Sequence, residues 1–257
     1  MQNTPVSIAV IIVSVLASVS LVYLLARFWP PGTRRSTHND IVGPSVQVLG
    51  TTYAVILAFM LSGVWTNFRL AESNAEREAN SLVNLSRISR GLPASESTQI
   101  YHLVKSYAAV IVNDEWPAMD KGEVSPKSHE IVQQIWRVLS EVQPQTPAQQ
   151  LSLDHALAEM SNFTEFRRIR QLQSRSQIPA MLWAVLVVGA VITVASACLF
   201  SAEDIGIHML HVFFLAFLLS LVLVAIANID HPFRGPVHVT SQSFTYALDT
   251  INGEDLL

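Results

Sequence analysis

Four long stretches of apolar residues, separated by polar segments, dominate the hydrophobic and polar pattern of the chain. They are Val6–Phe28, Val46–Trp65, Ile178–Phe200 and Ile205–Ile229, and Arg27 is the one Asp, Glu, Lys or Arg within them. A helix rises about 1.5 Å per residue, so each stretch is long enough to cross the roughly 30 Å of hydrocarbon in a bilayer. The pattern predicts an all-α integral membrane protein with four spans.

The polar segment between the second and third stretches repeats apolar residues every three or four positions. Such spacing predicts amphipathic helices, because it gathers apolar side chains on one face. We expect one helix from the second span to Leu92, one from a capping Ser95 to about Trp116, one over Ser128–Val142 and one through Leu153, Met160 and Ile169, with a break at Pro117–Pro126. These helices need to pack together or against neighbouring subunits.

The elements divide the chain into four parts. Residues 1–65 hold spans one and two, 66–177 form a helical cytosolic domain, 178–229 hold spans three and four, and 230–257 form a C-terminal elbow and tail. Lys and Arg near span ends favour the cytoplasmic side. With both termini and the large insert cytoplasmic, Arg69, Arg77, Arg167, Arg168, Arg170, Arg175 and Arg234 lie inside, against Arg27, Arg34 and Arg35 outside. The charge distribution predicts that orientation, although the three arginines at the first loop argue against it.

Composition narrows the functional classes. Charged residues make up 14 % of the chain, against about 25 % in ordinary soluble proteins. The single cysteine, Cys198, permits no intrachain disulfide and no cysteine-rich metal site. A net charge of −4 gives no reason to expect nucleic-acid binding. The chain lacks a phosphate-binding glycine loop and the common hydrolase motifs, so we expect no enzyme and no cofactor.

Two polar groups near span four are weak candidates for ion binding. Asp204, His208 and His211 follow a helical spacing that places them on one face, as a divalent-metal site requires, but solvated interfacial side chains fit the same pattern. The second group follows the span, as Asn228-Ile229-Asp230-His231-Pro232-Phe233-Arg234-Gly235-Pro236. It is either a helix stop with interfacial anchors or an elbow whose carboxylate and backbone oxygens sense a hard cation.

Span two differs from the other spans in carrying small and polar residues. Thr51, Val55 and Phe59 are spaced by four and form one stripe on a helix. In a symmetric oligomer such a stripe is suited to line an axial pore, with Val55 and Phe59 as a constriction that gates by dewetting. Ordinary helix packing is the alternative interpretation.

Three segments, in matching order and spanning essentially the whole chain, carry a family resemblance. They are Gly50–Arg87 with Leu57-Ala58-Phe59, Trp65, Glu72 and Glu78-Ala79; Arg167–Val194 with Ile178-Pro179, Leu182-Trp183 and Gly189–Thr193; and Ile229–Gly235 followed by Val237 and Val239. Together they resemble the bacterial bestrophin-like membrane proteins of undefined function, which are more distantly related to true bestrophins.

The resemblance implies a homopentameric, four-span ion channel in a bacterial inner membrane. In that family the second span lines a pore with a hydrophobic neck, a helical cytosolic domain lies between spans two and three, and an elbow after span four lies beside a calcium-binding clasp. By correspondence, Val55 and Phe59, with Thr51, fall at the neck. The residues that fall at the elbow run from Asp230 to Gly235.

The chain also departs from the bestrophin pattern. The acidic run that follows the elbow in calcium-activated bestrophins is absent, because Gly235 leads into Pro-Val-His-Val-Thr, and Arg234 interrupts Pro-Phe-Gly. These differences argue against calcium activation. Ion selectivity is also left open, because the neck candidates are uncharged.

The sequence therefore predicts an oligomeric, passive ion channel whose partners are the lipid bilayer, its own copies and inorganic ions. One alternative is a non-conducting interaction or sensor protein, which the absence of charge within the spans favours. The other is a membrane enzyme, for which Asp204, His208 and His211 are the sole candidates.

Overall fold

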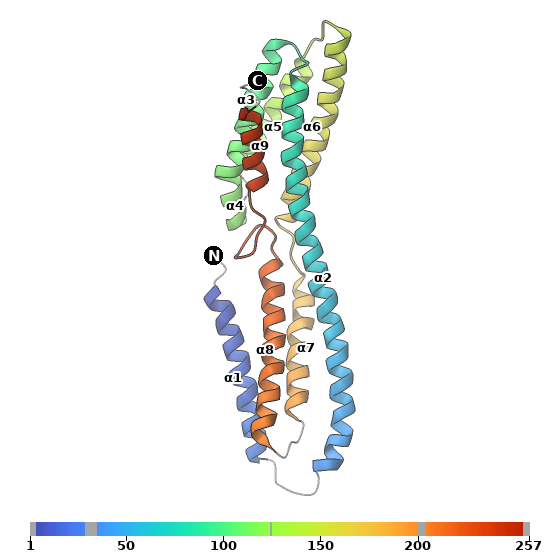
Figure 1. The fold of residues 1–257 in the computed structure, drawn as a ribbon, viewed down its shortest axis with the longest axis vertical. Coiled ribbons are helices and arrows are strands. Elements are labelled where there is room, and N and C mark those ends of the chain that lie inside the picture. The colour runs from blue at the N-terminus through green and yellow to red at the C-terminus, as the bar shows by residue number, and fades with distance from the viewer. Residues whose placement is uncertain (1–3, 29–34, 124, 200–203, 254–257) are drawn as a thin grey trace. The chain divides into compact units, whose positions relative to one another are not determined.

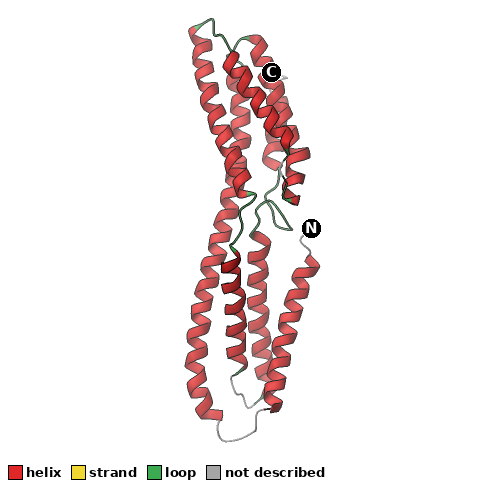
Figure 2. Ribbon diagram, turned by 180° about the vertical axis from the view of Figure 1, so that it is seen from behind, coloured by secondary structure: helices red, strands yellow, loops and turns green. Residues whose placement is uncertain are grey.

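The structure is a computed structural model that describes residues 4–28, 35–123, 125–199 and 204–253. These residues form helices and loops and no strand (Figure 2). In chain order the elements are α1 (Thr4–Phe28), α2 (Arg35–Ser89), α3 (Ala94–Val110), the π-helix η1 (Ile111–Glu115), α4 (Trp116–Lys121), α5 (Pro126–Glu141), α6 (Pro147–Gln173), α7 (Ala180–Cys198), α8 (Ile205–Ile229) and α9 (Gln242–Gly253) (Figure 1).

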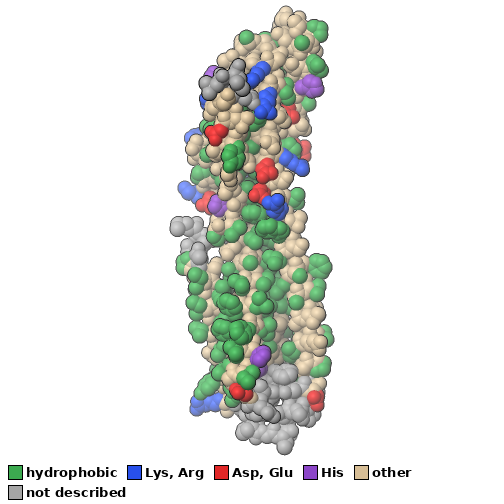
Figure 3. All heavy atoms as spheres, in the orientation of Figure 1, with side chains coloured by type: hydrophobic (Ala, Val, Ile, Leu, Met, Phe, Trp, Pro, Cys, Tyr) green, Lys and Arg blue, Asp and Glu red, His purple; other side chains and the backbone are tan. Residues whose placement is uncertain are grey.

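The chain divides into two compact units. The membrane unit comprises Met1–Thr66 and Gln177–Asp230, and the polar unit comprises Asn67–Ser176 and His231–Leu257. On the face drawn in Figure 3, hydrophobic side chains gather on the membrane unit, whereas most of the charged side chains lie on the polar unit. The helix α2 contributes residues to both units.

Within the described residues, four helices are long and apolar enough to cross a membrane: α1, α2, α7 and α8. The prediction of an all-helical, four-span membrane protein is therefore confirmed. Arg34 from the orientation count, Phe200 at the predicted end of span three, and residues 201–203 of the following loop lie outside the described residues.

The helix α2 begins earlier than the apolar pattern predicts. It starts at Arg35 rather than Val46 and contains Pro44. Hydropathy detects contact with lipid and not helicity, so it does not reveal that the polar residues before Val46 are helical. At its other end α2 runs without interruption to Ser89, as predicted from the continued apolar stripe.

Packing in the membrane unit depends on apolar contacts and a few hydrogen bonds. Tyr53 of α2 is buried in a cluster with Leu186 of α7 and Ile226 of α8, and its hydroxyl donates to the carbonyl of Leu186 at 2.6 Å. The hydroxyls of Ser14 in α1 and Ser220 in α8 lie 2.5 Å apart. Interhelical hydrogen bonds of this kind are typical of membrane helices.

In the polar unit, two predicted helix boundaries are wrong. Ser95 does not cap a helix, because α3 already begins at Ala94 and Pro93 occupies the N-cap position. Pro117 does not break the chain, since it lies in the first turn of α4, where its missing N–H costs little. The helical path through α3, η1 and α4 ends instead at Gly122, whose φ of 83° suits glycine.

Candidate functional site

The stripe that was predicted as a pore neck lies on an open face of α2. Thr51 is exposed, and Val55 and Phe59 are 49 % and 76 % exposed. The opposite face is buried through Tyr53 and Leu57, which pack with residues of α7 and α8. Packing within the protomer therefore does not explain the stripe, and its neighbours must be lipid, another copy or a pore.

The open face of α2 is richer in hydroxyl-bearing and small side chains than the exposed faces of α1 and α7. The exposed large hydrophobic residues of α1 and α7 are mostly branched aliphatic side chains. On α2 between Val46 and Trp65, the exposed positions also include Thr52, Ala54, Ala58, Ser62 and Gly63. Small residues such as Ala9, Ser20 and Ala184 are exposed on α1 and α7 as well, but the exposed side chains described on those two helices include no threonine and no glycine. Small and polar residues in membrane helices face protein or water.

The carboxylate of Asp230, at the start of the predicted elbow, holds the beginning of α7. Its Oδ1 accepts a hydrogen bond from the backbone N–H of Ile178 at 2.7 Å, and its Oδ2 accepts one from the indole N–H of Trp183 at 3.3 Å. Asn228 lies half-buried near the end of α8. Asp230 thus ties the end of α8 to the start of α7 through protein donors.

The rest of the elbow belongs to the polar unit. Nε of Arg234 donates to the carbonyl of Met119 at 3.2 Å. The guanidinium of Arg234 lies so close to Gly122 that a Cβ at this glycine would clash with it. The carbonyl of Pro232 accepts the N–H of Val239 at 2.7 Å. A cation at the C-terminus of α4 is electrostatically favourable. Phe233 is buried, and Gly235 adopts a φ of 87° that glycine tolerates best.

Two of the three candidate metal ligands, Asp204 and His211, have hydrogen-bond partners within α8. Oδ1 of Asp204 accepts the N–H groups of Gly206 and Ile207 and so caps α8. Nδ1 of His211 lies 2.8 Å from the carbonyl of Ile207, and Nε2 of His208 is buried with no hydrogen-bond partner among the described residues. Within the described ranges, no group of three His, Cys, Asp or Glu side chains is arranged to hold a metal ion.

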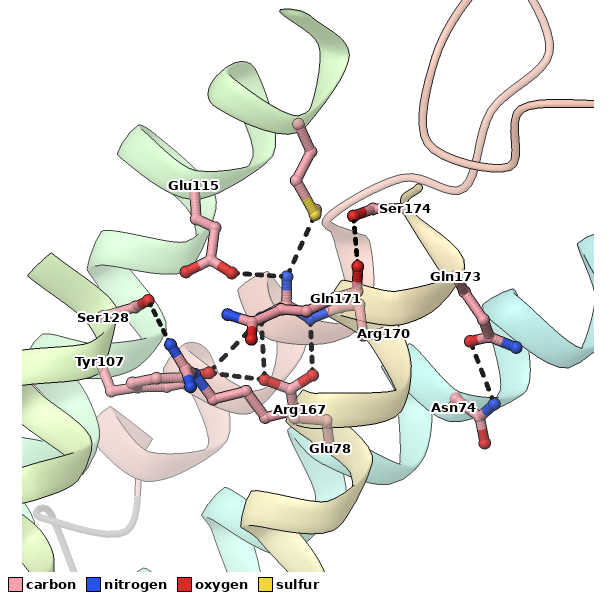
Figure 4. Close-up of polar contacts among 11 residues, drawn as sticks. Asn74, Glu78, Tyr107, Glu115, Ser128, Arg167, Arg170, Gln171, Gln173 and Ser174 are labelled. Atoms are coloured by element: carbon pink, nitrogen blue, oxygen red, sulfur yellow. Dashed lines mark hydrogen bonds and ion pairs between the residues drawn. The ribbon is translucent and has the colours of Figure 1, made fainter. Parts of the chain in front are cut away.

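A buried cluster of charges in the polar unit, which the sequence did not predict, centres on Arg170 (Figure 4). Arg170 is fully buried and donates to both oxygens of Glu78, at 2.6 and 3.1 Å, and to Oε1 of Glu115 at 2.9 Å. The hydroxyl of Tyr107 donates to Oε1 of Glu78 at 2.6 Å. Four elements, α2, α3, η1 and α6, thereby meet at one guanidinium.

The environment of this cluster shifts two pKa values. Burial alone would lower the pKa of Arg170, but Glu78 and Glu115 outweigh it and raise that pKa well above its usual range. Burial, and after it the Glu78 carboxylate, raise the pKa of Tyr107 well above its usual value. Arg170 therefore carries a permanent charge, and Tyr107 stays a neutral donor.

Arg170 also contacts the segment that follows the elbow through aromatic rings. Its guanidinium carbon lies 5.4 Å from the ring centroid of Trp116 and 5.8 Å from that of Phe244 in α9. Trp116 donates its indole N–H to the carbonyl of Val239 at 2.9 Å and packs edge-on against Phe233 at 5.6 Å. Trp116 thus joins the charge cluster to residues 231–253, here called the C-terminal segment.

A signal for the charge cluster was present in the apolar stripes. Glu78 lies beside Ala75, Ala79 and Leu82 on the buried face of α2, and Arg170 follows Phe163 on the buried face of α6. A charged residue at a position that the periodicity assigns to the core requires a buried partner. The sequence does not show which residue is that partner.

Comparison with known proteins gives one consistent result. A family model described as "Bestrophin-like domain" matches residues 12–244. A crystal structure of a bacterial bestrophin homologue from Klebsiella pneumoniae, phased with zinc, aligns with a TM-score of 0.71 at 11 % identity, over 96 % of this chain and 97 % of that one. A leucine-to-threonine variant of that homologue aligns with a TM-score of 0.72 at 11 % identity, over 95 % and 98 %. No curated protein matches the chain.

Proposed function

The chain belongs to the bestrophin-like family of multi-pass membrane proteins, and from that premise we propose that its copies assemble into a ring that conducts inorganic ions passively through an axial pore lined by α2. The observation that carries this proposal is the open face of α2. It holds hydroxyls and small side chains around Val55 and Phe59, while the opposite face packs within the protomer.

The chemistry of conduction follows from that face. Thr51 offers a hydroxyl to a hydrated ion, whereas Val55 and Phe59 form a ring without hydrogen-bonding groups when copies meet at an axis. Water leaves a narrow apolar ring readily, so its width determines whether an ion can pass. The span from Val46 to Trp65 is uncharged, so any selection of ions by fixed charges acts outside it.

We extend the proposal to the assembly and its orientation. A homopentamer in a bacterial inner membrane, with both termini and the polar unit in the cytoplasm, agrees with the family resemblance and with the arginines near the span ends. Conduction does not require calcium in this proposal, because the oxygens of Asp230 accept protein hydrogen bonds and no acidic run follows Gly235.

Ion flux from liposomes that contain the purified protein tests this function, together with the oligomeric state in detergent. A ring of five copies and a flux that persists in the presence of a calcium chelator are expected. A monomer cannot enclose a pore with one α2, so a monomeric protein would contradict the proposal. A stable oligomer without flux at any calcium concentration would favour the non-conducting interaction or sensor protein.

A further inference from the structure

A groove runs along α2 in the polar unit, on the side that faces α9, and is here called the α9 groove. It has a volume of about 510 Å³ and is lined by residues of α2, of α9 and of the loop before α9. Val83 and Ala247, which are buried, contribute apolar surface to it. Its charged residues are Glu72 and Glu76 at one end and Arg87 at the other, so the charge changes sign along the groove.

The rim of the α9 groove is suited to contact another polypeptide. Tyr246 of α9 is 60 % exposed, and its hydroxyl accepts a hydrogen bond from Nε2 of Gln242 at 2.6 Å. Exposed tyrosines are enriched where proteins meet, because one ring supplies both apolar area and a polar group. Carboxylates beside hydroxyls and an aromatic face favour guanidinium groups at the end that holds Glu72 and Glu76.

An exposed stripe on α6 carries charges of the kind that the α9 groove requires. In Figure 1, α9 and α6 lie on opposite sides of α2. The helix α6 meets α2 through hydrogen bonds from Asn74 to Gln173 at 3.2 Å and from Asn84 to Glu159 at 3.4 Å. At 3.6 residues per turn, the side of α6 turned away from these contacts holds five exposed residues, here called the outer stripe: Asp154, Glu165, Arg168, Leu172 and Arg175.

The same two hydrogen bonds fix which residues of α2 and α6 lie at the same level. The level of Asn74 is that of Gln173, and the level of Asn84 is that of Glu159, so the two helices are antiparallel. Interpolation at about 1.5 Å per residue places three pairs of opposite charge at one level, each to within about 3 Å. The pairs are Glu72 with Arg175, Glu76 with Arg168, and Arg87 with Asp154.

Matching levels on opposite flanks of α2 are what a ring requires. A rotation about an axis along α2 changes the position of a copy but not the level of its residues. It can therefore bring the outer stripe of one copy to the α9 groove of the next with all three pairs aligned. Because the two surfaces differ, the contact is heterologous, and heterologous contacts close into rings.

The partners that these charges have within the protomer are weak. Glu72 pairs with Arg69, and Arg168 lies 3.6 Å from Glu165, in both cases between neighbouring turns of one helix and largely exposed. Exposed pairs of this kind contribute little, so their exchange for contacts with another copy costs little. Leu172, which is 61 % exposed between Arg168 and Arg175, gains apolar contacts when it is covered.

We propose that the outer stripe of α6 in one copy docks in the α9 groove of the next copy and so joins the polar units around the ring. This inference rests on the ring assembly proposed above and adds the two surfaces that build it. The occupant of the groove is a second copy of this chain, identified by the order of its charges.

Cross-linking of introduced cysteines in the full-length, detergent-solubilised protein tests the contact. Glu76→Cys and Arg168→Cys in one chain, treated with a short bis-maleimide, are expected to give a ladder of covalently joined copies. Either substitution alone should give no ladder, because a heterologous contact joins two different residues. Cys198 is buried and common to all variants. The matched control combines Glu76→Cys with Glu130→Cys, an exposed position on α5 outside both surfaces, and should stay at the mass of one copy.

The outcomes separate this contact from the ring itself. An oligomeric protein whose double-cysteine variant stays at the mass of one copy would overturn the docking, assign the groove to another occupant and leave the ring standing. Equal ladders from the single variants, or from the control, would overturn it too. A protein that is monomeric before cross-linking would contradict both the contact and the ring.

Charge reversal tests the proposed complementarity. Arg168→Glu places like charges at the level of Glu76 and should raise the concentration at which the oligomer dissociates by roughly five-fold. Glu76→Arg should do the same, and the two together should restore most of the loss. Arg137→Glu, at an exposed position on α5 outside both surfaces, should have no effect. Light scattering on dilution measures dissociation, and a double variant as weak as the two single losses combined would refute the pairing.

Discussion

Arg170 and Glu78 form a double hydrogen bond, from Nε to Oε2 at 2.6 Å and from Nη2 to Oε1 at 3.1 Å, with both side chains completely buried. The pair joins α6 to α2. Removal of both charges from water is costly, and that cost is recovered only where geometry is good and the remaining donors are satisfied. Arg170 meets this condition, because its other N–H groups reach Glu115, Met119 and Tyr107.

Loss of the Glu78 charge is expected to destabilise the polar unit strongly. In Glu78→Gln the guanidinium of Arg170 stays buried with a weaker partner, so the free energy of unfolding should fall by about 3–5 kcal/mol. Denaturant unfolding in detergent measures this change. Glu165→Gln is the control, because Glu165 and Arg168 are a mostly exposed pair at 3.6 Å, and its effect should be close to zero. Comparable losses in the two variants would contradict the assignment.

The sequence predicted the spans well and the charge cluster not at all, for a physical reason. Lipid contact demands apolar side chains over a fixed length, which a local window of sequence reveals. The partners of Arg170, in contrast, come from Glu78 and Glu115, which lie far from it in the sequence. Periodicity shows that a charge faces the core, but it does not show which distant charge it meets.

The π-turn and the docked C-terminal segment were also beyond the sequence pattern. The apolar stripe of α3 continues past Ile111 with a one-residue change of phase, and the one sign of it in the sequence is Pro117, which predicts a helix break rather than a π-turn. The C-terminal segment was predicted as a tail, whereas it holds α9 with Phe244 and Ile251 fully buried. Its apolar residues are few, and they are buried against residues far away in the chain, among them Trp116, which packs on Phe244.

Tyr107 is expected to make the polar unit sensitive to alkaline pH. Its pKa is raised well above the usual value in the folded protein, by burial and by Glu78, so the unfolded chain releases this proton first. The unfolded state then binds fewer protons, and stability falls as pH rises above about 10, by at most about 1.4 kcal/mol per pH unit. Tyr107→Phe should flatten this fall in an unfolding series from pH 8 to 11. Tyr246→Phe, at a side chain that is 60 % exposed, should leave it unchanged.

Gly189 is required for the packing of α2 on α7. A Cβ at this position would lie 2.5 Å from Cε2 of Tyr53, whose hydroxyl is fixed by its hydrogen bond to Leu186. Gly189→Ala should therefore lower the thermal stability of the detergent-solubilised protein, by about 1–3 kcal/mol, as overpacked cores do. Gly63→Ala adds the same methyl group where nothing lies within 4 Å in the protomer, so its stability should equal or slightly exceed that of the wild type, since alanine favours a helix more than glycine does.

Substitutions of Asp230 separate hydrogen bonding from cation binding at the elbow. Asp230→Ala leaves the N–H of Ile178 and the indole of Trp183 without this acceptor, which should cost about 1–3 kcal/mol and speed amide exchange at the start of α7. Asp230→Asn keeps one oxygen acceptor and should have a smaller effect. If Asp230→Asn destabilised the protein as much as Asp230→Ala, the negative charge itself would be needed, as in a cation site.

Phe59 provides the most direct test of the proposed pore, because its side chain is 76 % exposed in the protomer and has no packing role there. If its ring narrows an axial path, Phe59→Ala widens an apolar constriction and makes it easier to wet. Single-channel recording in planar bilayers should then show a rise of roughly two-fold or more in conductance or open probability. Phe214→Ala makes the same change on α8, away from α2, at a side chain that is 58 % exposed. This control should have the conductance and open probability of the wild type. Because thermal stability should be unaffected by Phe59→Ala, a variant that folds normally and conducts as wild type would exclude Phe59 from the permeation path.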